Sequence, residues 1–174
     1  MNTTTLLTYL LLIGVLTQLA GAQWDLYFHV HNTFETVFSA PHMVLYTGML
    51  VTIVATMFEV RINRDVGQTV QRVMDDQVIQ SRWRSEYRLT KILAMGVVMQ
   101  IFGGIFDAMW HTLFGFDSLL SPTHLIFWGG LLVVTYSTAR KYAKTKLAFL
   151  GYGTQVISGA GFLLILGGSL PEAP

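Results

Sequence analysis

Five long apolar runs constrain this chain more than any other feature. They cover residues 5–22, 42–60, 92–106, 125–138 and 147–170. A helix needs about 20 apolar residues to cross the hydrocarbon core of a bilayer. The third and fourth runs are shorter, so we expect these two helices to continue into the residues beside them. Only 12% of the residues are charged, about half the usual fraction of a soluble domain. The sequence predicts an all-α, multi-pass membrane bundle of about five transmembrane helices.

The first run has two interpretations. Ala20-Gly21-Ala22 resembles a signal-peptide cleavage site. However, residues 1–24 carry no basic side chain, and a signal peptide normally begins with a basic region. We favour a retained membrane helix, with a signal peptide over residues 1–22 as the alternative.

The basic residues indicate which side of the membrane each loop faces. All eleven lie in two segments: Arg61, Arg64, Arg72, Arg82, Arg84, Arg88 and Lys91 in the first, and Arg140, Lys141, Lys144 and Lys146 in the second. Because cytoplasmic loops are enriched in Lys and Arg, we expect both segments and the N-terminus to be cytoplasmic. The other loops then face the outside. Nothing in this charge distribution indicates nucleic-acid binding, and the absence of cysteine excludes disulfides and thiolate metal sites.

The connector at residues 61–91 has its own pattern. Its apolar residues recur at helical spacing between charged ones, which predicts an amphipathic helix on the membrane surface or under the bundle. The alternative is a solvated linker. We therefore divide the single membrane domain, residues 1–174, into a first repeat at about 5–60, the connector, a second repeat at about 92–140 and a C-terminal helix at about 147–170.

A polar motif occurs twice, 82 residues apart, in the outward-facing loops. The copies are Asp25, His29, Glu35 and His42, and Asp107, His111, Asp117 and His124. Similarity extends to neighbouring positions, where Ser39 matches Ser121 and Gly48 matches Gly130. An even number of predicted crossings separates the copies, so they are parallel repeats.

Each copy has the residues of a metal site. A spacing of four places Asp107 and His111 on one helical face, and a hairpin brings His124 back towards them. We predict two metal triads, Asp25/His29/His42 and Asp107/His111/His124, of a ligand type that suits iron, zinc or copper. Glu35 and Asp117 are either partners that orient a ligating imidazole or solvated loop acids. His31 has no counterpart, because Leu113 occupies the matching position.

Two polar glutamines and several aromatic residues complete the pattern. We expect Gln100 and Gln155, which fall inside apolar runs, to form hydrogen bonds between helices. The aromatic residues that flank the motifs are typical of the belts at membrane interfaces; they are Trp24, Phe28, Phe106, Trp110, Phe127 and Trp128.

The doubled spacing over residues 24 to about 130 resembles the C subunit of the copper membrane monooxygenases, which include particulate methane monooxygenase and ammonia monooxygenase. The resemblance implies copper at one or both sites and oxidation of a small substrate by O2, while the ligand type alone leaves zinc or iron as alternatives. It also implies assembly with A-type and B-type subunits. Asp107, His111 and His124 would then be the catalytic set. The chain departs from the family at Asp107, where the family usually has Asn, and in its shorter length and smaller number of predicted spans.

Two other functions compete with this one. The chain could be a membrane metal-binding or metal-transport protein without oxygenase activity, although its helix interiors offer few polar residues for a continuous path. A metal-dependent hydrolase with Glu35 or Asp117 as the base is less consistent with the sequence, which has no His-Glu-x-x-His helix.

Overall fold

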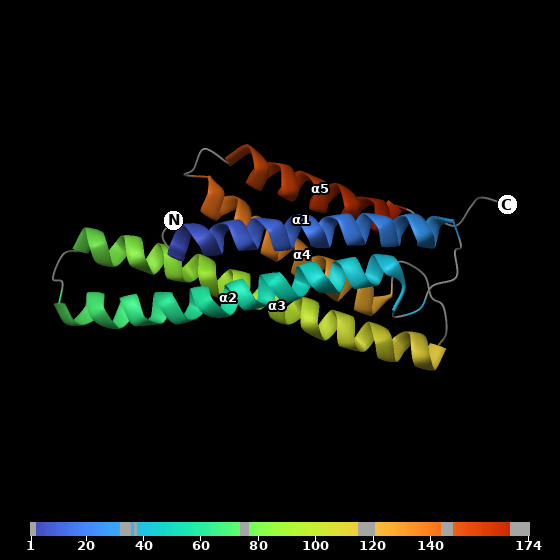
Figure 1. Cartoon of the computed structure of the whole chain (residues 1–174), viewed down its shortest axis with the longest axis horizontal. Helices are drawn as coiled ribbons and strands as arrows, with labels where there is room; N and C mark the ends of the chain where they lie inside the picture. Colours follow the sequence, from blue (N-terminus) through green and yellow to red (C-terminus); the bar gives the residue numbers. More distant parts are fainter. Residues whose placement is uncertain are drawn as a thin grey trace.

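The fold is a bundle of helices, seen here in a computed structural model that describes residues 3–31, 36, 38–73, 77–114, 121–143 and 148–167. Within these ranges there are five helices and no strand. They are α1 (Thr3–Val30), α2 (Ala40–Val73), α3 (Gln77–Phe114), α4 (Pro122–Tyr142) and α5 (Ala148–Gly167). Figure 1 shows them running side by side along one long axis. The predicted all-α bundle is confirmed.

Three of these helices are long and apolar enough to cross a membrane. The candidate spans are Thr5–Phe28, Ala40–Val70 and Gln77–Phe114. The chain is therefore a membrane protein by the length and composition of its helices. The predicted number of crossings and the predicted sidedness stay predictions.

The connector is helical, but it does not form a helix of its own. Residues 61–73 continue α2, and residues 77–91 form the first half of α3. The two extensions pack as a hairpin in which Trp83 Nε1 donates to the Asn63 carbonyl at 3.1 Å and the Trp83 ring covers Gly67. In Figure 1 this hairpin projects past the other helices. The amphipathic pattern correctly indicated helical structure. It could not show that the helical residues belong to the ends of α2 and α3.

Two antiparallel hairpins, α1–α2 and α3–α4, form the body of the bundle, and both are closed by glycines at equivalent positions. A Cβ atom on Gly48 would lie 2.5 Å from the backbone nitrogen of Gln18, and one on Gly130 would lie 2.8 Å from the backbone nitrogen of Gln100. Such contacts are impossible without a shift of the backbone, so glycine permits the close approach. The 82-residue repeat therefore extends from the motif into the packing of the helices.

The two hairpins meet across the centre of the bundle. Gln100 Nε2 donates to Gln18 Oε1 at 2.6 Å, and both side chains are fully buried. This confirms the predicted helix–helix hydrogen bond of Gln100. Gln18 and Gln100 are themselves 82 residues apart, so they are the same position in the two repeats. Two equivalent residues in contact lie on either side of a pseudo-two-fold axis, which therefore passes between them. Helix α5 packs against α4 and α1 outside this pair of hairpins.

Candidate metal centre

A cavity lies between the two hairpins and is lined equally by both repeats. Its walls are five pairs of positions that are each 82 residues apart: Ala22 and Gly104, Asp25 and Asp107, His42 and His124, Leu45 and Phe127, and Tyr46 and Trp128. The cavity therefore straddles the same pseudo-two-fold axis as the glutamine pair. The first acid and the last histidine of each motif copy therefore face one shared space.

In the first copy, α1 and α2 bring a carboxylate and an imidazole together. Asp25 lies in the last turns of α1, and His42 lies in the first turn of α2. His42 Nε2 is 3.0 Å from Asp25 Oδ1, and both side chains are mostly buried, with 11% and 13% exposed. Residues 17 positions apart thus meet because the chain reverses direction between the helices.

The second copy repeats this arrangement on α3 and α4. His124 Nε2 is 3.4 Å from Asp107 Oδ1, with exposed fractions of 9% and 16%. Ser121 caps α4 by accepting the backbone N–H of His124 at 3.2 Å, and Pro122 opens the helix. The cap and the proline fix where α4 begins, and this places His124 opposite Asp107.

The hydrogen bonds of His42 determine which ring nitrogen carries hydrogen. Its Nδ1 lies 2.8 Å from the Thr36 carbonyl oxygen and 3.0 Å from the Ser39 hydroxyl. A carbonyl oxygen only accepts, so Nδ1–H is the donor. In a neutral ring the Nε2 lone pair then faces the carboxylate of Asp25. Two acceptors at 3.0 Å need a hydrogen or a metal ion between them, which a proton on the ring or on the carboxyl group, or a bound metal, can supply.

The same accounting applies to His124. Thr123 Oγ1 donates to Asp107 Oδ1 at 2.7 Å, which uses its one hydrogen. The Ser121 hydroxyl must therefore donate in its 2.8 Å contact with Thr123 Oγ1. Its remaining contact, 2.8 Å to His124 Nδ1, is then one in which the ring donates. Again Nδ1 is protonated and Nε2 faces a carboxylate.

The donor atoms fit a metal ion. Ligand atoms at about 2.0–2.2 Å from a metal, at adjacent positions of a tetrahedral or octahedral site, are about 2.9–3.5 Å apart. The Nε2–Oδ1 distances of 3.0 and 3.4 Å lie within this range. An imidazole that donates Nδ1–H to a carbonyl or hydroxyl and presents Nε2 is the usual form of a metal-bound histidine.

The predicted triads are placed only in part. His29 and His111 lie on α1 and α3, but their side chains are outside the described set, as are Glu35 and Asp117 altogether. Among the described side chains, no three His, Asp or Glu residues are close enough to share one metal. The described part of each centre is therefore one imidazole and one carboxylate, and the four residues do not form a single four-ligand site.

Other residues near the motif differ from what the sequence suggested. Phe127 and Trp128 are buried and line the cavity instead of forming part of an interfacial belt. His31 is exposed, and its ring is tilted against that of Tyr27, with ring centroids 4.0 Å apart. It lies apart from the residues that line the cavity, in agreement with its lack of a counterpart.

Sequence reasoning missed the residues that orient the histidines. These are Thr36, Ser121 and Thr123, whose hydrogen bonds set the tautomers. Ser39 and Ser121 match in the repeat, but the sequence alone assigns them no role. The signal for them was the spacing Ser-x-x-His in both copies, which lets the hydroxyl reach the ring that lies one turn further along the helix.

Compared with known protein families, curated proteins and solved structures, the chain matches none.

Proposed function

We propose that the chain is the metal-binding membrane subunit of a copper-dependent monooxygenase that oxidises a small substrate with O2. The observation that carries this proposal is the pair of Nε2–carboxylate contacts on one cavity, at 3.0 and 3.4 Å, each with Nδ1 already used as a donor. The resemblance of the doubled motif to the C subunit of copper membrane monooxygenases supplies the choice of copper and of O2 chemistry.

The residues have distinct roles in this proposal. Asp25 and His42 hold one metal, and Asp107 and His124 hold a second, with His29 and His111 as the third ligands. When bound, copper supplies the activation of O2. Thr123 and Ser121 hold Asp107 and His124 in place through their hydrogen bonds. Leu45, Phe127 and Trp128 provide an apolar wall beside the centres, which suits a small uncharged substrate.

The test measures copper and substrate oxidation in membranes that carry the intact complex with its A-type and B-type partners. We expect copper in the wild type and its loss, together with O2-dependent oxidation, in the double variant His42→Ala/His124→Ala. His31→Ala is the matched control, because it removes an exposed imidazole that lies apart from the cavity, and it should keep both properties.

Three results decide against the proposal. If the wild type binds no copper, or if the double variant keeps its copper and activity, the assigned centres are wrong. If copper binds to the intact complex but no substrate is oxidised, the chain is a metal-binding membrane protein without oxygenase activity.

A further inference from the structure

Three polar features lie on the pseudo-two-fold axis, and the cavity is the first of them. The second is the glutamine pair, Gln18 and Gln100. The third is an ion pair at the opposite end of the bundle, where Lys141 Nζ lies 2.6 Å from Glu59 Oε2. Glu59 and Lys141 are again 82 residues apart, so this contact also joins equivalent positions across the axis.

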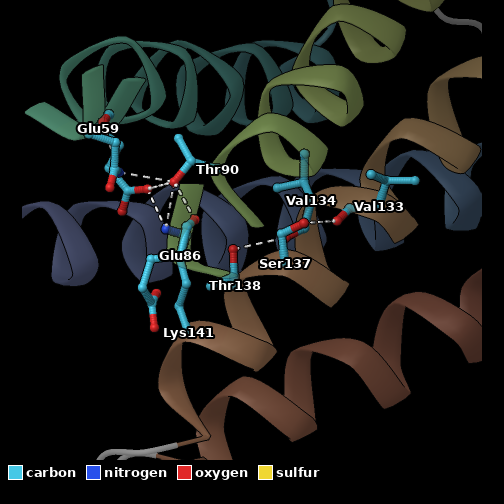
Figure 2. Close-up of polar contacts among 9 residues, drawn as sticks. Glu59, Glu86, Thr90, Val133, Val134, Ser137, Thr138 and Lys141 are labelled. Carbon is cyan, nitrogen blue, oxygen red and sulfur yellow. Dashed lines mark hydrogen bonds and ion pairs between the residues drawn. The ribbon is translucent and has the colours of Figure 1, made fainter. Parts of the chain in front are cut away.

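The ion pair is buried and belongs to a hydrogen-bonded cluster. Exposed fractions of the two side chains are 8% for Glu59 and 11% for Lys141. Thr90 on α3 is fully buried between them, at 3.4 Å from Glu59 Oε2 and 3.2 Å from Lys141 Nζ. Figure 2 shows Lys141 reaching from α4 towards Thr90 and Glu59. Ionisable groups in such a setting are costly unless paired, and they are functional candidates.

Buried polar side chains lie along the part of the bundle between the ion pair and the glutamine pair. Along α2 from His42 to Glu59 the distance is about 25 Å, at about 1.5 Å per residue. The inner face of α2 carries Thr52, Thr56 and Glu59 at helical spacing, and all three are buried. Thr52 Oγ1 accepts from Gln18 Nε2 at 2.8 Å, and the counterpart of Thr56, Thr138 on α4, is fully buried as well.

Two atoms on this line have hydrogen-bonding capacity that no described protein group takes up. They are Thr56 Oγ1 and Gln100 Oε1, in side chains that are 4% and 0% exposed. The Gln100 amide nitrogen Nε2 donates to Gln18 Oε1, whereas Gln18 Nε2 donates to Thr52, whose position is taken by Val134 in the second repeat. Nothing in the glutamine pair therefore donates to Gln100 Oε1. Buried polar atoms of this kind are where ordered water binds.

The side chains around Thr56 favour a proton over a hydrated metal cation. Gly14 on α1 lies against Thr52, and the helices are antiparallel, so Leu11 lies about level with Thr56. Leu11 and its counterpart Leu93 are both fully buried. An apolar collar with a few hydroxyl groups would impose a large desolvation cost on a hydrated metal cation, whereas a proton can pass from one hydroxyl or water to the next.

We propose that this axis conducts protons between the Glu59–Lys141 end of the bundle and the cavity at Asp25 and Asp107. Each hydroxyl or water on the line accepts one proton and releases another, so the number of protons entering at one end equals the number leaving at the other. No oxidation or reduction is involved. The proposal does not depend on copper or on the proposed monooxygenase function.

The experiment uses the full chain in lipid vesicles that contain a pH-sensitive dye and a metal chelator. A potassium gradient with valinomycin sets the membrane potential that drives proton movement. We expect the dye to report proton flux above that of protein-free vesicles. Thr56→Val should reduce the flux to the protein-free level, because it removes the hydroxyl while keeping the shape of the side chain. It should not lower the melting temperature, because the lost hydroxyl has no described partner.

Matched variants separate conduction from folding. Thr47→Val lies on the exposed face of the same helix and should keep the flux of the wild type. The double variant Glu59→Gln/Lys141→Met removes both charges together and should abolish the flux. The proposal is overturned if the wild type conducts no better than protein-free vesicles, if Thr56→Val conducts as the wild type does, or if the current is carried by sodium or potassium without a change of pH.

Discussion

The ring nitrogen that faces away from the carboxylate determines what His42 and His124 can do. Because Nδ1 donates to Thr36 in one case and to Ser121 in the other, Nε2 is the atom that meets the acid. A tautomer with hydrogen on Nε2 would form an ordinary hydrogen bond to the carboxylate and leave no lone pair for a metal. In the proposed metal centres, the oxygens that orient the two rings are therefore needed as much as the ligand atoms.

The two serines that match in the repeat should differ in their effect on metal binding. Ser121→Ala removes the hydroxyl that accepts from His124 Nδ1–H, and we expect about a 10–100-fold loss of metal affinity at that centre. Ser39→Ala should have a smaller effect, because the Thr36 carbonyl still accepts from His42. Copper titration of the two variants measures the difference. Equal losses would contradict this assignment of acceptors.

Ser121 also caps α4, so its loss has a structural component of about 1 kcal/mol. A control is needed for that component. Thr123→Val leaves the cap in place but removes the donor to Asp107. If Thr123→Val also weakens copper binding while the melting temperature stays close to that of the wild type, the effect belongs to the site and not to the helix end.

Asp107 is the position at which this chain makes its two centres alike. Asp107→Asn keeps an oxygen that can accept from Thr123 but removes the negative charge opposite His124. We expect weaker binding of Cu(II) at the second centre and unchanged binding at the first, because a neutral amide is a poorer ligand for a cation than a carboxylate. Cu(II) is titrated into the wild type and into Asp107→Asn, and electron paramagnetic resonance distinguishes the copper bound at the two centres. Asp25→Asn should give the reverse pattern.

The meeting of each acid with the later histidine could be predicted from the sequence, but the tautomers of the histidines could not. The spacing of Asp107, His111 and His124 and the helical period place an acid and a later histidine on facing helices. The structure brings Asp107 and His124 to 3.4 Å in agreement with this. The proton positions depend on Thr36 and Ser121, whose distances follow from the exact start of α2 and α4. Helix ends are the least certain part of a prediction from sequence.

At the scale of the helix, glycines decide how closely the hairpins can close. Gly14, Gly21 and Gly48 lie in the α1–α2 hairpin, and their counterparts lie in α3–α4. Each faces a backbone or side-chain atom at a distance that excludes a Cβ atom. Small residues at such contacts are the usual means of helix association in membranes. The hairpins owe their similarity to these contacts as well as to the motif.

Gly21→Ala is expected to destabilise the first hairpin. Its Cβ atom would lie 2.5 Å from the Leu45 backbone nitrogen, and an overpacked contact of this kind costs about 1–3 kcal/mol. Gly153→Ala is the matched control, because nothing lies within 4 Å of its Cβ position. In α5 that change should stabilise by about 0.5–1 kcal/mol. Unfolding of both variants in detergent tests the prediction, and a lower melting temperature for Gly153→Ala would contradict it.

The connector shows where helical periodicity stops being informative. The spacing of apolar residues in 61–91 predicts a helix equally well whether it stands alone or continues its neighbours. What joins it to α2 and α3 is the contact of Trp83 with Gly67 and Asn63. This contact links residues that are 16 and 20 positions apart, and the local spacing of apolar residues does not predict it.

At the scale of the whole molecule, the repeat explains why polar groups collect in the interior. A position near a pseudo-two-fold axis meets its own counterpart. A buried polar side chain placed there by one repeat is therefore met by the polar side chain of the other. Gln18 and Gln100 illustrate this with identical residues, and Glu59 and Lys141 with residues that have diverged to opposite charge. The sequence contained both matches at the 82-residue offset, but their contact depends on where the axis lies.

The ion pair allows a test of the axis itself. Lys141→Met alone leaves Glu59 buried without its cation, and we expect a loss of about 3–5 kcal/mol of stability. Glu59→Lys should cost a similar amount, because two ammonium groups would then meet. The double variant Glu59→Lys/Lys141→Glu restores opposite charges at equivalent positions, so we expect it to be more stable than the Glu59→Lys single variant.

Recovery should nevertheless be incomplete. Thr90 and Asn63 are hydrogen-bonded to each other at 3.1 Å beside Glu59, and the structure gives Lys141 contacts with Thr90 and Glu59. Thr90 corresponds to Thr8 in the first repeat, but Asn63 corresponds to Thr145, so a reversed pair lacks the side-chain amide beside its carboxylate. Unfolding in detergent gives the coupling energy of the double variant. If the swapped protein is no more stable than Glu59→Lys alone, the two positions are not interchangeable about an axis. The ion pair would then not lie on the same axis as the cavity.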